Sequence, residues 1–310
     1  MPVEPAITAL LARYGPLPPL PVDRAHVEQL REQGRALAED LVPIEVGAVE
    51  DGALPGPAGE IPVRVYRPEG ADGPVPTVVF FHGGGWVAGD LDSHDQITRR
   101  LCRDVHAVVV AVHYRRAPEH PFPAPLDDCL AAARHVAEHR DDYGGGRLAV
   151  AGDSAGANTA AVTALVFRDE RRPLDAQLLA YPPTDCSGTR SHPSRTENGE
   201  GYFLTTETIE ELQRVYAGGD PGALRSWRIS PLLAPDFTGV APAVIGTARY
   251  DPLRDEGRAY AEALADAGTD VFHRTYDGLV HGFLSLFEQS PASDAATAEL
   301  FAQLAERLRP

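Results

Sequence analysis

The amino-acid sequence predicts an α/β fold with a mostly parallel central sheet and helices on both of its faces. Short, continuous apolar runs are typical of strands that are buried on both sides. Such runs occupy residues 77–81, 107–112, 148–152, 177–181 and 243–247. Segments of helical character separate or follow them, at about residues 93–104, 125–141, 155–171, 253–267 and 291–308. Strands that alternate with helices in this way form parallel sheets, and ligands bind at the carboxyl ends of their strands.

Two further strands are expected outside this regular series. From about Ile44 the pattern changes to strands, and Ile61, Val63 and Val65 alternate along EIPVRVYRP. This alternation predicts a half-buried strand at an edge of the sheet. Residues 269–277 form the last strand-like segment of the chain.

The length of 310 residues is compatible with one α/β domain that carries insertions. Residues 1–43 are helix-prone but rich in proline, with PLPPLP at 16–21 between two short segments. Residues from about 183 to 240 interrupt the strand-helix alternation, with one helical piece near 206–216, and are too long for an ordinary connection. We expect these two parts to form a helical cap on a main domain that spans residues 44–310.

The charge and the missing lysines exclude several classes of function. A formal charge of −17 repels phosphate backbones, so we expect no nucleic-acid partner. All 28 basic residues are arginine, which excludes Schiff-base chemistry, serine-lysine dyads and the lysine of a phosphate-binding loop. Cys102, Cys129 and Cys186 form no CxxC pair, so we expect buried, reduced thiols and no zinc site.

The location of the protein is inferred from features that the sequence lacks. The apolar runs are far too short to cross a bilayer, so we expect no membrane association. The amino terminus has no basic start followed by an apolar stretch and a cleavage site of small residues. These observations favour a cytoplasmic location.

Two glycine-rich loops follow predicted strands. VAGDSAGA, residues 150–157, places Ser154 in a GxSxG pattern between a strand and a helix, which is the position of a nucleophile elbow. HGGGW, residues 82–86, follows another strand and exposes backbone N–H groups that an oxyanion hole needs. Each loop has a structural alternative, a helix cap for the first and a tight turn for the second, but the pair favours catalysis.

Partners for Ser154 are expected in the loops after the last two strands. Asp251 is the first carboxylate beyond residues 243–247, whereas Asp255 and Glu256 fall in a first helical turn and suit the helix dipole. His281 lies in a glycine-flanked loop, whereas His273 lies inside the last strand. The order Ser154, Asp251, His281 is the order expected for a hydrolase triad.

Five motifs in this order resemble the hormone-sensitive-lipase-like esterases, the bacterial family IV carboxylesterases of the α/β-hydrolase fold. They are HGGGWVAGD, YRRAPEHPFPA, GDSAGAN, DPLRDEG and HGF. The resemblance runs from about residue 45 to the carboxyl terminus, and the amino-terminal helices suit that family's cap.

The resemblance implies a role for each residue of the site. Ser154 would be the nucleophile, His281 the base and Asp251 its orienting acid. Gly84, Gly85 and the N–H of Ala155 would be the oxyanion donors. His82 and residues 114–124 would be structural, and Trp86 a pocket wall or a core residue.

The function expected from this resemblance is serine carboxylesterase activity on small esters of short to medium acyl chain. The reaction would use an acyl-enzyme and require neither a metal nor an organic cofactor, and a homodimer is compatible with the sequence. An amidase or peptidase with the same triad stays open. A ligand receptor on the same fold is disfavoured, because receptors related to this family lack the histidine that is present here as His281.

Overall fold

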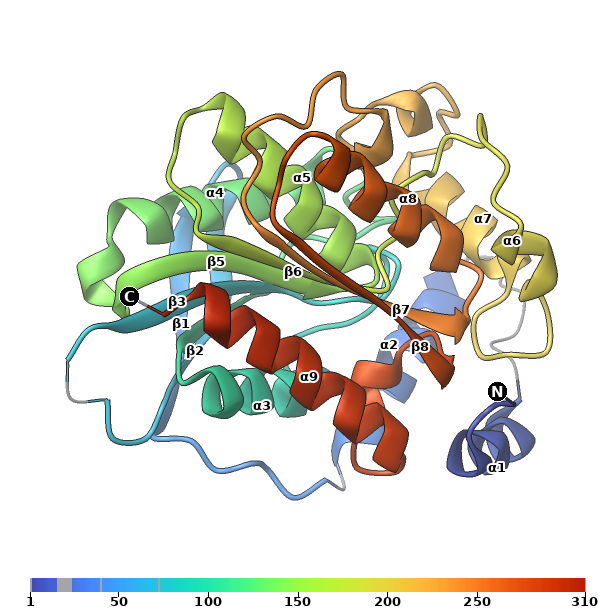
Figure 1. The fold of residues 1–310 in the computed structure, drawn as a ribbon, viewed down its shortest axis with the longest axis horizontal. Helices are drawn as coiled ribbons and strands as arrows, with labels where there is room; N and C mark the ends of the chain where they lie inside the picture. Colours follow the sequence, from blue (N-terminus) through green and yellow to red (C-terminus); the bar gives the residue numbers. More distant parts are fainter. Residues whose placement is uncertain (1, 16–23, 40, 72, 310) are drawn as a thin grey trace.

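The computed structural model describes residues 2–15, 24–39, 41–71 and 73–309. Their centre is one eight-stranded sheet in the order β1-β2-β4-β3-β5-β6-β7-β8 (Figure 1). All pairs from β4 to β8 are parallel, whereas β2 runs antiparallel to both β1 and β4. The strands are β1 (Ala48–Gly56), β2 (Gly59–Arg67), β3 (Val75–Phe81), β4 (Val108–Val112), β5 (Gly145–Asp153), β6 (Ala176–Ala180), β7 (Ala243–Tyr250) and β8 (Val271–Val280).

The five apolar runs form β3 to β7, and residues 269–277 fall largely in β8, so the predicted α/β fold is confirmed. The edge position expected for EIPVRVYRP is wrong. This segment lies in β2, and β1 pairs along its whole length on the outer side, from Ala48 opposite Arg67 to Gly56 opposite Gly59. The sequence of β1, AVEDGALPG, has no regular alternation of apolar and polar residues, and most of this strand is exposed. An exposed edge strand leaves no apolar alternation to detect.

Helices cover both faces of the sheet, as the sequence predicts. The apolar side chains of α3 and α9 pack with one face of the sheet. Those of α4, α5 and α8 pack with the other, and Figure 1 shows these two groups on opposite sides of the strands. The bounds are α3 (Asp95–Val105), α4 (Ala124–Glu138), α5 (Ala155–Asp169), α8 (Arg254–Asp266) and α9 (Pro291–Arg307).

The remaining helices lie in the two segments that interrupt the regular alternation. In Figure 1, α2, α6 and α7 are on the side toward which the parallel strands point, and α1 lies farther out, near β8. The PLPPLP sequence between α1 and α2 lies outside the described residues. The bounds are α1 (Pro5–Tyr14), α2 (Arg24–Glu39), α6 (Ser194–Glu197) and α7 (Thr206–Tyr216), with short 3₁₀ turns at Arg140–Asp142, Ala223–Arg225, Pro231–Leu233 and Phe283–Ser285.

The three cysteines are buried and unpaired, as expected. Among the helices of the described residues, none is long and apolar enough to cross a membrane.

The turn from β5 into α5 passes very close to the end of β3. A Cβ on Gly156 would lie 1.9 Å from the carbonyl oxygen of Phe81, and one on Gly152 would lie 2.3 Å from the carbonyl carbon of Gly156. Both distances are shorter than atoms can approach without displacing backbone. Glycine at these two positions therefore allows the ends of β3 and β5 to meet at the start of α5.

We predict that Gly156→Ala destabilises the protein by about 3 kcal/mol, because the added methyl group overpacks a junction made of backbone. The free energy of unfolding in urea measures this change. Gly52→Ala is the matched control, since its Cβ would meet nothing nearer than the Val63 side chain at 4.0 Å. Equal stability of the two variants would contradict this account of the junction.

Candidate active site

Ser154 occupies the sharp turn between β5 and α5. Its backbone has φ 51° and ψ −121°, an unfavourable conformation for a residue with a side chain. The Ser154 N–H donates to the carbonyl oxygen of Ala180, 2.9 Å away at the end of the neighbouring β6. The turn leaves the Ser154 side chain partly exposed while its neighbours in the chain are buried. The strained turn thus presents one hydroxyl at the carboxyl edge of the sheet.

His281 and Asp251 complete a hydrogen-bonded chain with this hydroxyl. His281 follows β8, and its Nε2 lies 3.0 Å from the Ser154 Oγ. Its Nδ1 lies 2.8 Å from Oδ2 of Asp251, which follows β7 and is fully buried. Because a carboxylate can only accept here, Nδ1 carries the ring proton and Nε2 is free to accept one from the serine. The three residues that the sequence analysis singled out are therefore in contact.

The Asp251 carboxylate is held by more than the histidine. Its Oδ1 accepts the N–H of Leu253 at 2.8 Å. The side-chain amide of Asn198 donates to the backbone carbonyls of Arg249 and Asp251, at 3.1 and 3.2 Å. These bonds fix the turn after β7 and, with it, the direction of the carboxylate toward His281.

The first turn of α8 binds the long segment that follows β6 and holds it next to the turn that carries Asp251. Asp255 Oδ2 accepts the N–H of Ser194 at 2.8 Å. Glu256 is fully buried, accepts the N–H groups of Thr184 and Asp185 at 2.8 Å, and pairs with Arg195 at 2.7 Å. The sequence predicts only a helix-dipole role for these two acids. Their partners lie some sixty to seventy residues away along the chain and give no local signal.

The glycine loop after β3 needs glycine at successive positions. Gly84 has φ +107° and Gly85 has φ +61°, and a Cβ on Gly85 would lie 2.6 Å from the Leu212 side chain of α7. Within the described part of the chain, the N–H groups of Gly84, Gly85 and Ala155 have no protein acceptor. Ala155 is the first residue of α5, so its N–H is also at the positive end of a helix dipole.

Stacked aromatic rings hold both ends of this loop. His82 is buried and stacks on Tyr114 at 4.2 Å, and the Tyr114 hydroxyl donates to the His82 carbonyl oxygen. Burial lowers the pKa of His82 well below its usual range. Trp86 is also buried and stacks on Tyr216 of α7 at 4.3 Å, which favours the core alternative for this tryptophan. His273 lies in β8 beside Thr247, as expected for a sheet residue.

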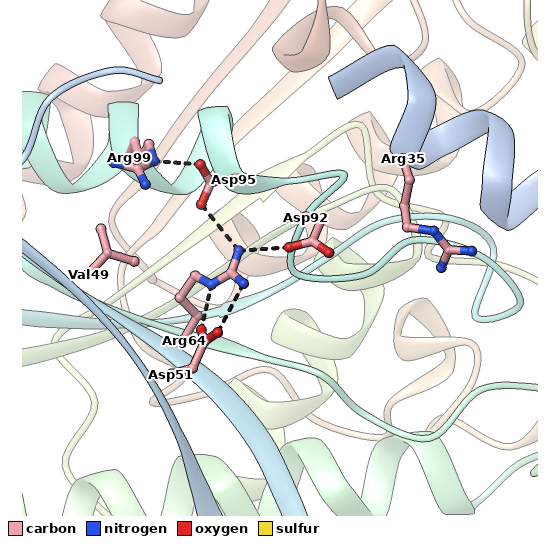
Figure 2. A pocket seen from close by; sticks show the side chains of 7 residues that line it. All are labelled: Arg35, Val49, Asp51, Arg64, Asp92, Asp95 and Arg99. Atoms are coloured by element: carbon pink, nitrogen blue, oxygen red, sulfur yellow. Dashed lines mark hydrogen bonds and ion pairs between the residues drawn. The ribbon is translucent and has the colours of Figure 1, made fainter. Parts of the chain in front are cut away.

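A separate cavity of about 580 Å³ contains none of the residues described above. Arg64 lies in this cavity and forms ion pairs with Asp51, Asp92 and Asp95 (Figure 2). The carboxylates of the cavity are therefore neutralised by guanidinium groups. Among the described residues, no group of three or more His, Cys, Asp and Glu side chains could hold a metal ion. The cavity is lined by Arg35, Val49, Asp51, Arg64, Asp92, Asp95 and Arg99.

The chain is similar in sequence and structure to known ester hydrolases. Residues 78–285 match a family model described as the alpha/beta hydrolase fold. The chain is 44% identical to the carboxylic ester hydrolase LipN of Mycobacterium tuberculosis, over 90% of this chain and 76% of LipN. It is 41% identical to the carboxylesterase NlhH of the same organism, over 93% and 89% of the two chains. A hyperthermophilic esterase from Pyrobaculum calidifontis superposes with a TM-score of 0.91 at 38% identity, over 99% of each chain.

Helix α2 is fastened to the end of the glycine loop by one buried arginine. The Arg31 guanidinium donates to the carbonyl oxygens of Val87, at 2.9 Å, and Ala117, at 3.1 Å. It also makes two hydrogen bonds of 2.9 Å to the Glu119 carboxylate. The Arg31 side chain is 7% exposed, so its removal would leave two carbonyls and a carboxylate without their donor.

We predict that Arg31→Met lowers the free energy of unfolding by about 3 kcal/mol, because two backbone carbonyls lose their buried donor and Glu119 loses its ion-pair partner. The control is Arg35→Met, also in α2, whose 42%-exposed side chain makes one ion pair with Asp90 and should cost less than about 1 kcal/mol. Urea unfolding of both variants checks this, and equal effects would contradict it.

The same pair predicts a dependence of stability on pH. Hydrogen bonds from Arg31 lower the pKa of Glu119 to about 2. A depressed carboxyl pKa stabilises the fold above the ordinary glutamate pKa, and this contribution is lost as the pH falls toward the folded value. The difference in stability between wild type and Arg31→Met should therefore shrink between about pH 5 and about pH 3.

Proposed function

Because the chain belongs to the hormone-sensitive-lipase-like carboxylesterases of the α/β-hydrolase superfamily and is a carboxylic ester hydrolase, we propose that it hydrolyses short to medium acyl-chain esters through an acyl-enzyme on Ser154. The observation that carries the proposal is the hydrogen-bonded chain from Ser154 through His281 to Asp251. Its substrate is a small-molecule ester.

The first half of the proposed cycle forms the acyl-enzyme. His281 Nε2 removes the Ser154 proton as Oγ attacks the ester carbonyl, and Asp251 stabilises the resulting imidazolium through Nδ1. Collapse of the tetrahedral intermediate breaks the bond to the alcohol, which leaves with the proton from Nε2. A water molecule then repeats the sequence on the acyl group, releases the acid and restores Ser154.

The negative charge that develops on the carbonyl oxygen needs donors that are already aimed at it. We assign this role to the N–H groups of Gly84, Gly85 and Ala155, which have no acceptor within the described residues. Each donor of this kind contributes about 3 kcal/mol to transition-state stabilisation. The left-handed backbone of the two glycines supports the assignment, because it turns successive amides away from the usual strand pattern.

A helical cap over the site is part of the proposal and comprises residues 1–43 and about 183–240. Its support is the contact between α2 and α7 at the glycine loop, where Val27 and Val215 share one buried cluster with Val87. Leu212 of α7 lies directly against Gly85. In contrast, α1 packs at the far edge of the sheet, where Glu4 bonds to Gly278 and Ile7 joins the core. The centre of the cap is therefore the α2–α7 pair.

We predict that Ser154→Ala lowers kcat/KM for a p-nitrophenyl ester by at least about 10⁴-fold without loss of stability, because no other group supplies the nucleophile. Ser226→Ala is the matched control, since Ser226 is also half-buried and, among the described residues, its hydroxyl accepts a single hydrogen bond, of 3.3 Å, from the Arg228 N–H. Retention of more than a few per cent of the wild-type rate would refute the nucleophile assignment.

We predict a rate maximum between butanoyl and octanoyl esters and no rise in rate when the substrate forms micelles. Among the described residues, the only large apolar side chains that are exposed are Tyr14 and Val42, which is too little for docking on an emulsion. A series of p-nitrophenyl esters from acetyl to palmitoyl, measured below and above the critical micelle concentration, tests this. A maximum at palmitoyl, or a jump in rate at micelle formation, would contradict it.

A further inference from the structure

We infer that His94 is a positioning residue for the glycine loop, which it controls through the carboxylate of Asp153. Its ring lies at ion-pair distance from this carboxylate and next to the Gly83 N–H that the carboxylate accepts. The charged ring thereby holds the carboxylate on Gly83, which sets the direction of the next two amides. The inference rests on the proposed role of Gly84 and Gly85 as oxyanion donors.

Asp153 joins the nucleophile strand to the glycine loop. It is the last residue of β5, directly before Ser154, and its side chain is buried. Its Oδ1 accepts the Gly83 N–H at 2.8 Å. A Cβ on Gly83 would lie 2.4 Å from Asp153 Oδ2, so the carboxylate packs against this glycine. The Gly83 amide is therefore unavailable to a substrate, and the following amides are the first that can face one.

The two ring nitrogens of His94 contact different groups. His94 Nε2 lies 3.3 Å from Asp153 Oδ1 and 3.2 Å from the Gly83 nitrogen. The Gly83 N–H donates to the Asp153 carboxylate at 2.8 Å and is also directed at His94 Nε2. The ring therefore lies at ion-pair distance from the oxygen that holds the Gly83 amide. His94 Nδ1 lies 3.0 Å from Ser93 Oγ, which donates to the carbonyl oxygen of Asp90 and accepts the Asp90 N–H. Ser93 Oγ can thus accept from Nδ1, which carries a ring proton.

The charges that face His94 favour the protonated form of its ring. Burial alone would lower the pKa of His94, but the carboxylates of Asp153 and Asp90 outweigh it and raise the pKa above the ordinary histidine value. The third facing group is His82, whose ring centroid is 5.5 Å away. Burial keeps His82 neutral, and its Nδ1 donates to the Gly83 carbonyl oxygen at 2.8 Å. The Gly83 residue is thus held at its nitrogen by Asp153 and at its oxygen by His82.

The segment that carries His94 is held by the ion pairs of Arg64, which lines the charged cavity. Figure 2 shows the Arg64 guanidinium between Asp51, Asp92 and Asp95. Arg64 donates to Asp92 at 2.9 Å and to Asp95 at 3.4 Å, on either side of His94 in the chain. On the amino-terminal side, Asp90 Oδ1 accepts the Ser93 N–H at 2.9 Å. The residues on either side of His94 in the chain are therefore held by hydrogen bonds and ion pairs.

This arrangement gives activity a second dependence on pH. A histidine whose folded pKa is raised holds its partner fully below the ordinary histidine pKa and releases it as the pH rises through the folded value. As His94 loses its proton, its hold on Asp153 weakens and the glycine loop is less well directed. The result is an alkaline fall in kcat, separate from the acidic fall caused by protonation of the triad base.

The test compares two substitutions that differ in one property. The side-chain amide of His94→Gln can still donate to Asp153 but does not titrate, whereas His94→Phe cannot donate. We expect the Phe variant to lose about tenfold in kcat at an unchanged KM, because misdirected oxyanion donors affect the transition state alone. We expect the Gln variant to keep kcat within about threefold of wild type and to lose the alkaline fall. His273→Phe, at a half-buried histidine of β8, is the control for removal of an imidazole.

Two results would overturn the inference: wild-type kcat in the Phe variant, or an unchanged alkaline fall in the Gln variant. Titration of the wild-type protein, with labelled histidine followed by NMR, gives a readout that does not depend on how the variants fold. The pKa of His94 must lie above the ordinary histidine value, and a pKa at or below that value would also overturn it. Loss of activity in Ser154→Ala together with full activity in His94→Phe would leave the proposed function intact and refute only the role of His94.

Discussion

The backbone crossing between the end of β3 and the first turn of α5 leaves no space for a side chain at Gly156. Two groups of the site depend on this crossing. It places the strained Ser154 turn beside the glycine loop, and it brings Asp153 within hydrogen-bonding distance of Gly83. The parallel order of β5, β6, β7 and β8 then brings the turns that carry Asp251 and His281 to the same edge. The geometry of the site thus follows from strand order and from one close backbone contact.

Arginine connects this edge to the elements around it. The protein has no lysine, and single guanidinium groups link separate elements of the fold. Arg31 joins α2 to the glycine loop, Arg64 fixes the segment before α3, and Arg195 holds the segment after β6 on Glu256. A planar group with five donors can bridge carbonyls and carboxylates that lie on different elements, which a lysine ammonium does less well. A chain with a net charge of −17 supplies the carboxylates that these arginines need.

The parts of the fold that the sequence predicts are those with a local signal. Continuous apolar runs predict β3 to β7, and the glycines around Ser154 and after His82 predict two turns at strand ends. Strand β1 gives no such signal, because its pairing depends on backbone and most of its side chains face solvent. The links of Asp153 to Gly83 and of Glu256 to Thr184 join residues about seventy positions apart. A single sequence contains no pattern from which such pairs can be inferred.

Covalent labelling tests most directly whether Ser154 is the nucleophile that forms the covalent intermediate. A p-nitrophenyl alkylphosphonate mimics the tetrahedral intermediate and cannot be hydrolysed like an acyl group. Mass spectrometry of the digested protein should find one phosphonyl group per chain, on the peptide that contains Ser154. The fraction of esterase activity lost should equal the fraction of chains labelled. Inactivation with the label on another residue, or full labelling of Ser154 with activity retained, would contradict the account.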